Sequence, residues 1–379
     1  MNHTKTSKRR LKLGRILAAA VCILFLLFLA VVVLCYFGGA FHRAKNENSS
    51  SPDALQVLQS NQTTANTTTE ATTTTTTTTT LYPPVAQTDT KTVALTDASV
   101  VLARNAALID PASHTLIAQR KADEQIYPAS LTKIMSMLTV IRLLGEESKL
   151  YHAYIMDGDL IGPLRAQSAV CAGFQGGEPC RIIDMLYGMM LPSGADAAVG
   201  MAIYTAGSVE AFVSEMNAYA KEMGLTQTHF VNCTGLHDDR HVSTVNEIAC
   251  ILSYALQNPL CRQIMATDQY TTAATVQHPN GLTVHSTLFS RMTGTELDDI
   301  TVCGGKTGFT DQAGQCLATW AKTKEGKEYI CVVAGCNGAQ PMEAVYDTLT
   351  IYDQYRSGDG IGAVRFMADS DGIADREAA

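Results

Sequence analysis

The arrangement of apolar and polar residues changes its period twice between residues 94 and 357. Ala106–Asp110 and Thr115–Arg120 flank the turn Pro111-Ala112-Ser113-His114, which predicts a β-hairpin. After the hairpin, apolar residues recur every three or four positions, as they do along the buried face of a helix. This spacing predicts helices over Leu131–Leu144, Ile182–Met190, Val209–Met223 and Asn246–Gln257.

The pattern returns to that of strands near the end of this region. It predicts strands over Thr301–Thr307, Gln315–Thr323 and Glu328–Gly335, and then a helix over Pro341–Tyr355 that packs back on the sheet. Strands at both ends of a region, with helices between them, are typical of an α+β domain. We therefore expect an antiparallel sheet built from both chain ends, with a helical middle region.

The first forty residues carry a long apolar run. Ile16–Phe37 holds no charged residue, and as a helix it would be about 33 Å long, enough to cross a bilayer. The basic residues before it favour a cytoplasmic tail at residues 1–15, a transmembrane signal-anchor over 16–41, and a single-pass protein whose body lies outside the cell membrane. The alternative is a cleaved signal peptide, but such peptides have a shorter apolar region and a better cleavage site than Gly38-Gly39-Ala40.

Residues 42–92 are rich in Thr, Asn, Ser and Gln, with an unbroken threonine run at Thr72–Thr80. With almost no apolar residue to bury, this segment cannot offset the entropy of ordering, and it is predicted to be a disordered tether. A glycosylated stalk is the alternative, since Asn48, Asn61 and Asn66 lie in N-x-Ser/Thr sequences. Residues 358–379 are predicted to be an acidic flexible tail, which leaves 93–357 as the folded domain.

Composition excludes two classes of protein. Of the 379 residues 46% are hydrophobic and 17% charged, so the chain is not wholly disordered. The formal net charge is −8, but residues 1–45 hold 8 of the 28 basic residues and no acidic one. The rest has 20 basic against 36 acidic residues, a net charge of −16, and this acidic body argues against a nucleic-acid partner.

Cysteine and histidine positions predict no metal site and no cofactor. Nine of the eleven cysteines follow the apolar run, and Cys-x₂-Cys spacing is absent, which argues against zinc. Cys171 and Cys180 bracket a glycine-rich loop and are the best candidates for a disulfide, on spacing alone. His114, His237 and His241 lie in turn-like surroundings and are predicted to be loop residues without a catalytic role.

Three short motifs could carry chemistry. In Ser130-Leu131-Thr132-Lys133 a hydroxyl and an amine lie three residues apart at a helix start, so they share one face, and a lysine of lowered pKa could take the serine proton. Lys306-Thr307-Gly308 lies on a strand, where the cation and hydroxyl could bind a carboxylate and the glycine could let a peptide lie alongside.

The third motif, Ser193-Gly194-Ala195-Asp196, follows a predicted helix and offers a second hydroxyl that could relay a proton. Taken singly, the three have ordinary explanations: a surface Ser-x-x-Lys, a strand-turn signal and a helix cap. Together, their order and spacing match the Ser-x-x-Lys, Ser-Asp-Asn and Lys-Thr-Gly set of active-serine enzymes.

The longer segments around these motifs resemble the low-molecular-mass serine-type D-Ala-D-Ala carboxypeptidases, which are penicillin-binding proteins. The resemblance covers about residues 94–357 and implies a β-lactamase/transpeptidase-like fold. The segments that carry it are Tyr127-Pro128-Ala129-Ser130-Leu131-Thr132-Lys133-Ile134-Met135, Leu186-Tyr187-Gly188-Met189-Met190-Leu191-Pro192-Ser193-Gly194, Thr228-His229-Phe230-Val231-Asn232 with Gly235-Leu236, and Gly305-Lys306-Thr307-Gly308-Phe309-Thr310-Asp311 with Ala313-Gly314.

The resemblance implies a substrate and a role for each site residue. The substrate would be a peptidoglycan stem peptide ending in D-Ala-D-Ala, and β-lactams would acylate the same serine. Ser130 would be the nucleophile, Lys133 its base and Ser193 the proton relay. Lys306 would keep Lys133 neutral by repulsion and attract the terminal carboxylate, which Thr307 would hydrogen-bond. The backbone N–H groups of Ser130 and Phe309 would form the oxyanion hole.

Two departures from the family pattern leave other functions open. Ala195 stands where family members usually have Asn, and losing that amide could cost about 1–3 kcal/mol. The 71 residues after Gly308 complete the sheet and last helix, so we expect no appended β-rich domain, with the N-terminal span replacing the family's C-terminal anchor. The rivals are a serine β-lactamase, although no Glu-x-x-Leu-Asn segment is evident, a non-hydrolytic penicillin-binding or wall-sensing protein, and a stalked adhesion-type membrane protein.

Overall fold

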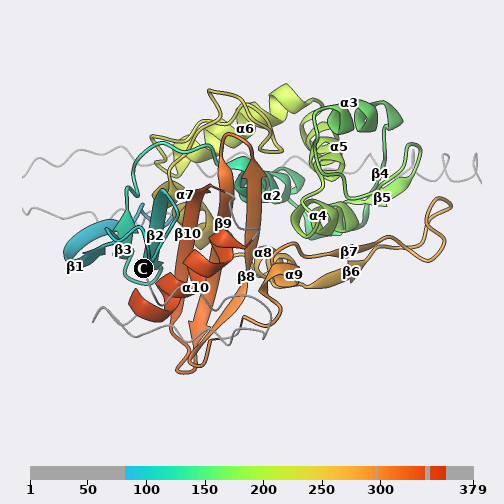
Figure 1. Cartoon of the computed structure of the whole chain (residues 1–379). Coiled ribbons are helices and arrows are strands. Elements are labelled where there is room, and N and C mark those ends of the chain that lie inside the picture. The colour runs from blue at the N-terminus through green and yellow to red at the C-terminus, as the bar shows by residue number, and fades with distance from the viewer. Residues whose placement is uncertain (1–81, 296, 338–341, 356–379) are drawn as a thin grey trace, which may run out of the picture. The chain divides into compact units, whose positions relative to one another are not determined.

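A six-stranded sheet forms the centre of the described part of the chain, which comprises residues 82–295, 297–337 and 342–355 of a computed structural model. The strand order is β1-β3-β2-β10-β9-β8. The strands are β1 (Gln87–Ala94), β2 (Asn105–Asp110), β3 (Thr115–Arg120), β8 (Ile300–Thr310), β9 (Gly314–Thr323) and β10 (Glu328–Cys336). Because β10 pairs with β2, the sheet joins the first and last strands of the region, as predicted (Figure 1).

The prediction of a wholly antiparallel sheet is wrong at one edge. β1 pairs with β3 in parallel, whereas the other strand pairs are antiparallel. The connection over residues 95–104 carries the chain past the position of β3 to β2, so β1 and β2 run in opposite directions with β3 between them. β3 is antiparallel to β2 and therefore runs the same way as β1.

The folded region also begins earlier than the predicted tether boundary at residue 92. β1 starts at Gln87, and most of its side chains are exposed, so it lacks the alternation that marks a half-buried strand. Tyr82 packs edge-on against Tyr219 and Tyr254, and Ala86 is buried. Residues 82–94 are thus part of the domain. The predicted cytoplasmic tail, anchor and acidic tail, and the tether up to residue 81, lie outside the described residues.

Helices cover both faces of the sheet. On one face lies α10 (Glu343–Tyr355), whose Tyr352 packs with Cys331 and Val333. The larger helical region lies on the other, with Ile330 and Val332 in its core. Its helices are α2 (Thr132–Leu144), α3 (Ile161–Ala166), α4 (Ile182–Met190), α5 (Ala195–Ala206), α6 (Val209–Glu222), α7 (Val245–Ala255), α8 (Pro259–Met265) and α9 (Phe289–Met292). This confirms the α+β class.

Five helices were predicted to within a few residues, whereas α5 and the short elements were not. α5 was missed because half of its twelve residues are Ala or Gly and it is buried around much of its surface, which leaves no polar face to reveal the period. Two small ribbons were also missed, β4 (Ala153–Ile155) with β5 (Pro179–Arg181) and β6 (Gln269–Thr271) with β7 (Thr283–His285), as were the 3₁₀ turns η1 (Ala129–Leu131), η2 (Glu147–Tyr151) and η3 (Gly158–Leu160).

No individual helix within residues 82–295, 297–337 and 342–355 combines the length and apolar character needed to cross a bilayer. α5 and α6 meet these criteria only when taken as a pair, and the pair is bent by 85°.

Candidate active site

The turn that carries Ser130 is held between two glycines. Ala129, the residue before it, has φ of +47°, in the left-handed region. A Cβ atom on Gly235, itself at φ +83°, would lie 1.9 Å from the carbonyl oxygen of Ala129. On the β8 side, a Cβ on Gly308 would lie 3.1 Å from the backbone nitrogen of Ser130. The Ala129–Ser130 backbone is therefore packed between the loop at Gly235 and strand β8.

Lys133 lies one turn further along and faces the serine. Its Nζ donates to Ser130 Oγ at 3.0 Å and to the Thr234 carbonyl at 2.6 Å. The side-chain oxygen of Asn232 accepts from the backbone N–H groups of Thr234 and Gly235 and so fixes that carbonyl. Burial lowers the pKa of Lys133 to about 8. A fraction of the lysine is neutral at pH 7 and can accept the serine proton.

Ser193 lies in the loop between α4 and α5 with its hydroxyl inside the protein. Its φ is +69°, and its Oγ is buried without a hydrogen-bond partner among the described residues. Asp196, in the first turn of α5, accepts from the backbone N–H groups of Ala172 and Gly173 and so ties the glycine-rich loop to this helix. Asp196 is fully buried, and Ala195 before it, the first residue of α5, is buried as well.

Lys306 is buried on β8, and among the described residues its amine bonds to its own strand. Its Nζ donates to the Thr307 carbonyl at 2.9 Å. Burial, followed by repulsion from Lys133 and from Arg291 of α9, lowers the pKa of Lys306 well below 10.5. Burial is the chief cause of the lowered pKa of both lysines, and the repulsion between the two cations adds to it.

The remaining predicted residues lie along the same strand. Thr307 is buried, and its Oγ1 lies 2.6 Å from Thr287 Oγ1. Gly308 is buried against the Ser130 turn, whereas the Phe309 side chain is 54% exposed. In the described sheet β8 is an edge strand, so its outer edge can pair with an extended peptide.

The predicted cluster of four polar side chains is only partly assembled by hydrogen bonds. Ser130 and Lys133 are bonded to each other, as expected. Ser193 Oγ has no partner in the part of the chain described, and Lys306 donates to Thr307. Within the described residues, Ser193 and Lys306 are therefore not hydrogen-bonded to Ser130 or Lys133.

Several residues of the site were missed from the sequence. Asn232 belongs to the third segment of the resemblance, which was noted without a role, and Thr234 lies between the two parts of that segment. Thr287 and Arg291 follow the β6–β7 ribbon and gave no periodic signal. His241 was predicted to be a loop residue without a role; it does lie between regular elements, but it is 2% exposed and bonded to Thr132.

The predicted disulfide is also wrong. All nine described cysteines are free thiols, including Cys171 and Cys180. The thiol of Cys180 is directed to the carbonyl of Glu178, while that of Cys171 is directed to the carbonyl of Ala169. Each thiol therefore bonds within its own local segment, and the glycine-rich loop between them is held by polar contacts instead.

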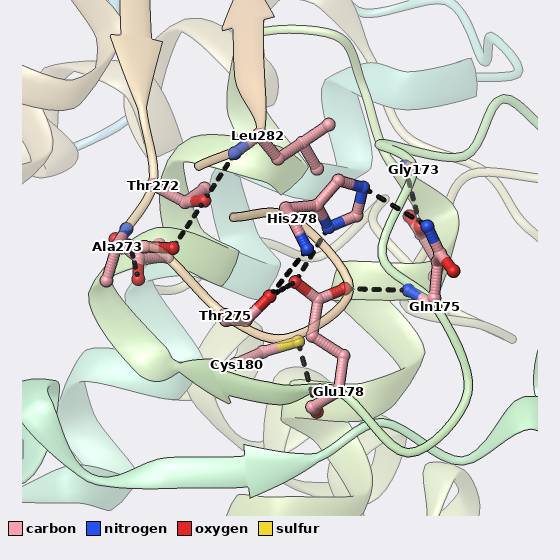
Figure 2. Close-up of polar contacts among 11 residues, drawn as sticks. Gly173, Gln175, Glu178, Cys180, Thr272, Ala273, Thr275, His278 and Leu282 are labelled. Atoms are coloured by element: carbon pink, nitrogen blue, oxygen red, sulfur yellow. Dashed lines mark hydrogen bonds and ion pairs between the residues drawn. The ribbon is translucent and has the colours of Figure 1, made fainter. Parts of the chain in front are cut away.

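A buried carboxylate joins the glycine-rich loop to the β6–β7 ribbon, as Figure 2 shows. Glu178 Oε1 lies 2.8 Å from His278 Nδ1 and accepts from Thr275 Oγ1 at 2.8 Å, while Oε2 accepts from the backbone N–H of Gln175 at 2.9 Å. Burial alone would raise the pKa of Glu178, but these hydrogen bonds lower it below its ordinary value. The contacts brace the loop that Asp196 ties to α5.

A family model, curated relatives and solved structures all match this chain. The family described as D-alanyl-D-alanine carboxypeptidase matches this chain over residues 90–338. DacC of Escherichia coli, a D-alanyl-D-alanine carboxypeptidase, is 32% identical over 260 residues, 67% of this chain and 61% of that protein. DacF of Bacillus subtilis, of the same description, is 30% identical over 251 residues, with coverage of 64% and 59%.

The chain thus spans about 60% of the length of these curated relatives. Among solved structures, a DD-transpeptidase from Streptomyces superimposes with a TM-score of 0.57 at 28% identity. That match covers 66% of this chain and 96% of the other.

Proposed function

The chain belongs to the D-alanyl-D-alanine carboxypeptidase family, and from this premise we propose that it removes the terminal D-alanine from peptidoglycan stem peptides through an acyl-enzyme on Ser130. The observation that carries the proposal is the 3.0 Å contact between Ser130 Oγ and the buried Nζ of Lys133, whose pKa is about 8. A nucleophile in hydrogen-bond contact with a base of lowered pKa is the arrangement that acyl transfer needs. The motif resemblance to this family is confirmed.

Acylation follows from these contacts. Neutral Lys133 takes the proton of Ser130 as Oγ bonds to the carbonyl carbon of the penultimate D-alanine. The carbonyl oxygen, now negative, is stabilised by the backbone N–H groups of Ser130 and Phe309. The C–N bond breaks, and the proton reaches the leaving D-alanine amine by way of the Ser193 hydroxyl. Being buried and unbonded in the free enzyme, that hydroxyl can form a new hydrogen bond without breaking an old one.

The terminal carboxylate of the peptide would bind at Lys306, Thr307 and Arg291. A carboxylate beside Lys306 favours the charged form of this lysine, whose pKa burial and neighbouring cations otherwise depress. The ammonium group so formed repels a proton on Lys133. Substrate binding therefore promotes the neutral form of the base when the nucleophile needs it.

Hydrolysis of the ester completes the cycle. Water gives a proton to Lys133 and bonds to the ester carbon, the bond to Ser130 Oγ breaks, and the serine regains its proton. β-Lactams would acylate Ser130 in the same way and remain attached for as long as this water is slow. Members of the family thereby act as targets of these antibiotics.

We also propose that residues 16–41 anchor the enzyme in the cell membrane, with the catalytic domain outside. The support is the composition of this segment and the basic residues before it. Membrane fractionation, followed by protease treatment of intact cells, tests this proposal. Recovery of the full-length protein in the soluble fraction would overturn it.

The central experiment incubates the detergent-solubilised chain with a peptide ending in D-Ala-D-Ala and measures free D-alanine, beside a Ser130→Ala control. We expect release by the first protein only. Equal release by both would reject Ser130 as nucleophile. Rapid turnover of penicillin would favour a β-lactamase instead, and a stable penicillin adduct without D-alanine release would favour a non-hydrolytic sensor.

A further inference from the structure

A buried imidazole lies behind the turn that carries Ser130. His241 is 2% exposed, and its Nδ1 accepts the backbone N–H of Val231 at 3.0 Å. Its Nε2 lies 2.7 Å from Thr132 Oγ1. Thr132, itself fully buried, donates its hydroxyl hydrogen to the carbonyl oxygen of Ala129 at 2.8 Å. Two hydrogen bonds therefore connect His241 to the peptide group that precedes the proposed nucleophile.

The donor and acceptor at each of these hydrogen bonds follow from the two groups at the ends, the Val231 N–H and the Ala129 carbonyl. Because Nδ1 accepts an N–H, it carries no hydrogen, and the neutral ring must carry its hydrogen on Nε2. Burial, the largest influence on this ring, lowers the pKa of His241 to about 4, which keeps it neutral. Nε2–H then donates to Thr132 Oγ1. The only hydrogen of that hydroxyl is left for the Ala129 carbonyl, which is an acceptor and nothing else.

The Ala129 carbonyl shares its peptide group with the backbone N–H of Ser130. This N–H is one of the two proposed oxyanion donors. The peptide follows a residue at φ +47°, a region that alanine seldom adopts, so its orientation depends on contacts from outside. Gly235 limits it by close packing, and the backbone N–H and the side-chain hydroxyl of Thr132 both donate to its carbonyl. Of these two donors, only the hydroxyl is linked to His241. A hydrogen bond to the carbonyl also polarises the N–H at the other end of the same peptide.

We propose that His241 is a positioning residue that acts through Thr132 to aim and polarise the Ser130 N–H toward the oxyanion. This inference rests on the proposed acyl-transfer function. The ring bonds to Val231 and Thr132 and not to Ser130 Oγ or Lys133 Nζ, so it is not the base. Its effect is on the transition state for acylation, since only there does negative charge build up on the carbonyl oxygen.

The test measures acylation of the full chain by a fluorescent penicillin, separating the dissociation constant of the first complex from the acylation rate constant. His241→Phe keeps an aromatic ring but removes both nitrogens, and Thr132→Val keeps the shape but removes the hydroxyl. We expect each to lower the rate constant by about 10- to 50-fold with the dissociation constant unchanged within twofold. The double variant should be no slower than the slower single variant, because both changes interrupt the same series of hydrogen bonds.

Conservative variants separate positioning from folding. Thr132→Ser restores the hydroxyl, and His241→Gln restores an N–H near the position of Nε2, so both should acylate within about threefold of the parent chain. His229→Phe makes the same change at an exposed histidine of the same segment and should have no effect. Additive losses in the double variant, or equal losses in Thr132→Val and Thr132→Ser, would overturn the proposal.

A spectroscopic measurement does not depend on rates. In the acyl-enzyme, the infrared band of the ester carbonyl moves to lower wavenumber as the oxyanion donors polarise it. The band should shift upward in Thr132→Val and stay in place in Thr132→Ser; an unshifted band in Thr132→Val would overturn the proposal. Failure of the proposed function is distinguishable, since the parent chain would then release no D-alanine from the peptide, whatever the effect of the variants on acylation by penicillin.

Discussion

The two sides of the candidate site differ in how far they are assembled before a substrate arrives. On the nucleophile side, comprising Ser130, Lys133 and Thr234, each polar side chain or carbonyl already has its partner. On the receiving side, within the described chain, the buried hydroxyl of Ser193 has no hydrogen-bond partner and the buried amine of Lys306 donates to a backbone carbonyl alone. The difference teaches that the nucleophile is prepared in advance, whereas the substrate completes the groups that receive it.

The largest effect expected from this comparison comes from removing the base. Lys133→Met should lower the rate of acylation by penicillin by about 10³-fold or more, because general-base assistance to the serine is lost. Its melting temperature should change little, since the gain from replacing a buried amine of depressed pKa by an apolar chain offsets the lost hydrogen bond to the Thr234 carbonyl. Mass spectrometry of the adduct over time gives the rate. A loss of less than tenfold would contradict the division between the two sides.

Ser193→Ala tests the receiving side and should separate rate from stability. D-Alanine release should fall about 100-fold, because the path of the proton to the leaving amine is broken. The free energy of unfolding should rise by up to about 1 kcal/mol, since the hydroxyl is buried without a hydrogen bond. Urea denaturation measures the second quantity. A clear loss of stability would mean that Ser193 bonds to the protein before substrate binds.

The pH dependence of acylation sharpens the description of the nucleophile side. The pKa of Lys133 is lowered to about 8, so the neutral base is the minor form at pH 7 and the major form above pH 8. Acylation should therefore rise with pH, with a midpoint near 8, and be roughly tenfold slower at pH 7 than on the plateau. A rate independent of pH between 6 and 9 would exclude Lys133 as the group that must lose its proton.

The smallest expected effect concerns the contact between Glu178 and His278, which holds the glycine-rich loop near the receiving side. Glu178→Gln should lower the free energy of unfolding by about 1–2 kcal/mol at neutral pH, because the charge-assisted contact with His278 is weakened. The folded-state pKa of Glu178 lies below its ordinary value, so its contribution is present above pH 4.5 and is lost as pH falls through the folded pKa. Chemical denaturation at pH 7 and pH 3.5 checks this: the difference between parent and variant should shrink at the lower pH.

The sequence predicted the two sides of the site unequally, because their residues are close along the chain on one side and far apart on the other. Ser130 and Lys133 are three residues apart at a helix start, so local geometry brings them together, and their contact was predicted. Ser193 and Lys306 were identified by motif, but their distances depend on how separate elements pack. Arg291 enters the site from a short helix without periodic signal.

The fold, too, was predicted only where a local pattern of apolar residues reveals an element. The sheet and long helices follow from apolar spacing, whereas β1 is exposed and was taken for tether. A histidine in a turn-rich segment looks exposed from its neighbours alone. His241 is buried only because residues 228–243 fold against the start of α2, which no local pattern reveals.

The two glycines around the Ser130 turn restrict how this enzyme can evolve. A side chain at Gly235 would collide with backbone atoms of Ala129, and trimming a neighbouring side chain cannot create room for it. A side chain at position 235 is therefore compatible with the Ser130 turn only if the backbone itself moves, so the two segments can change only together.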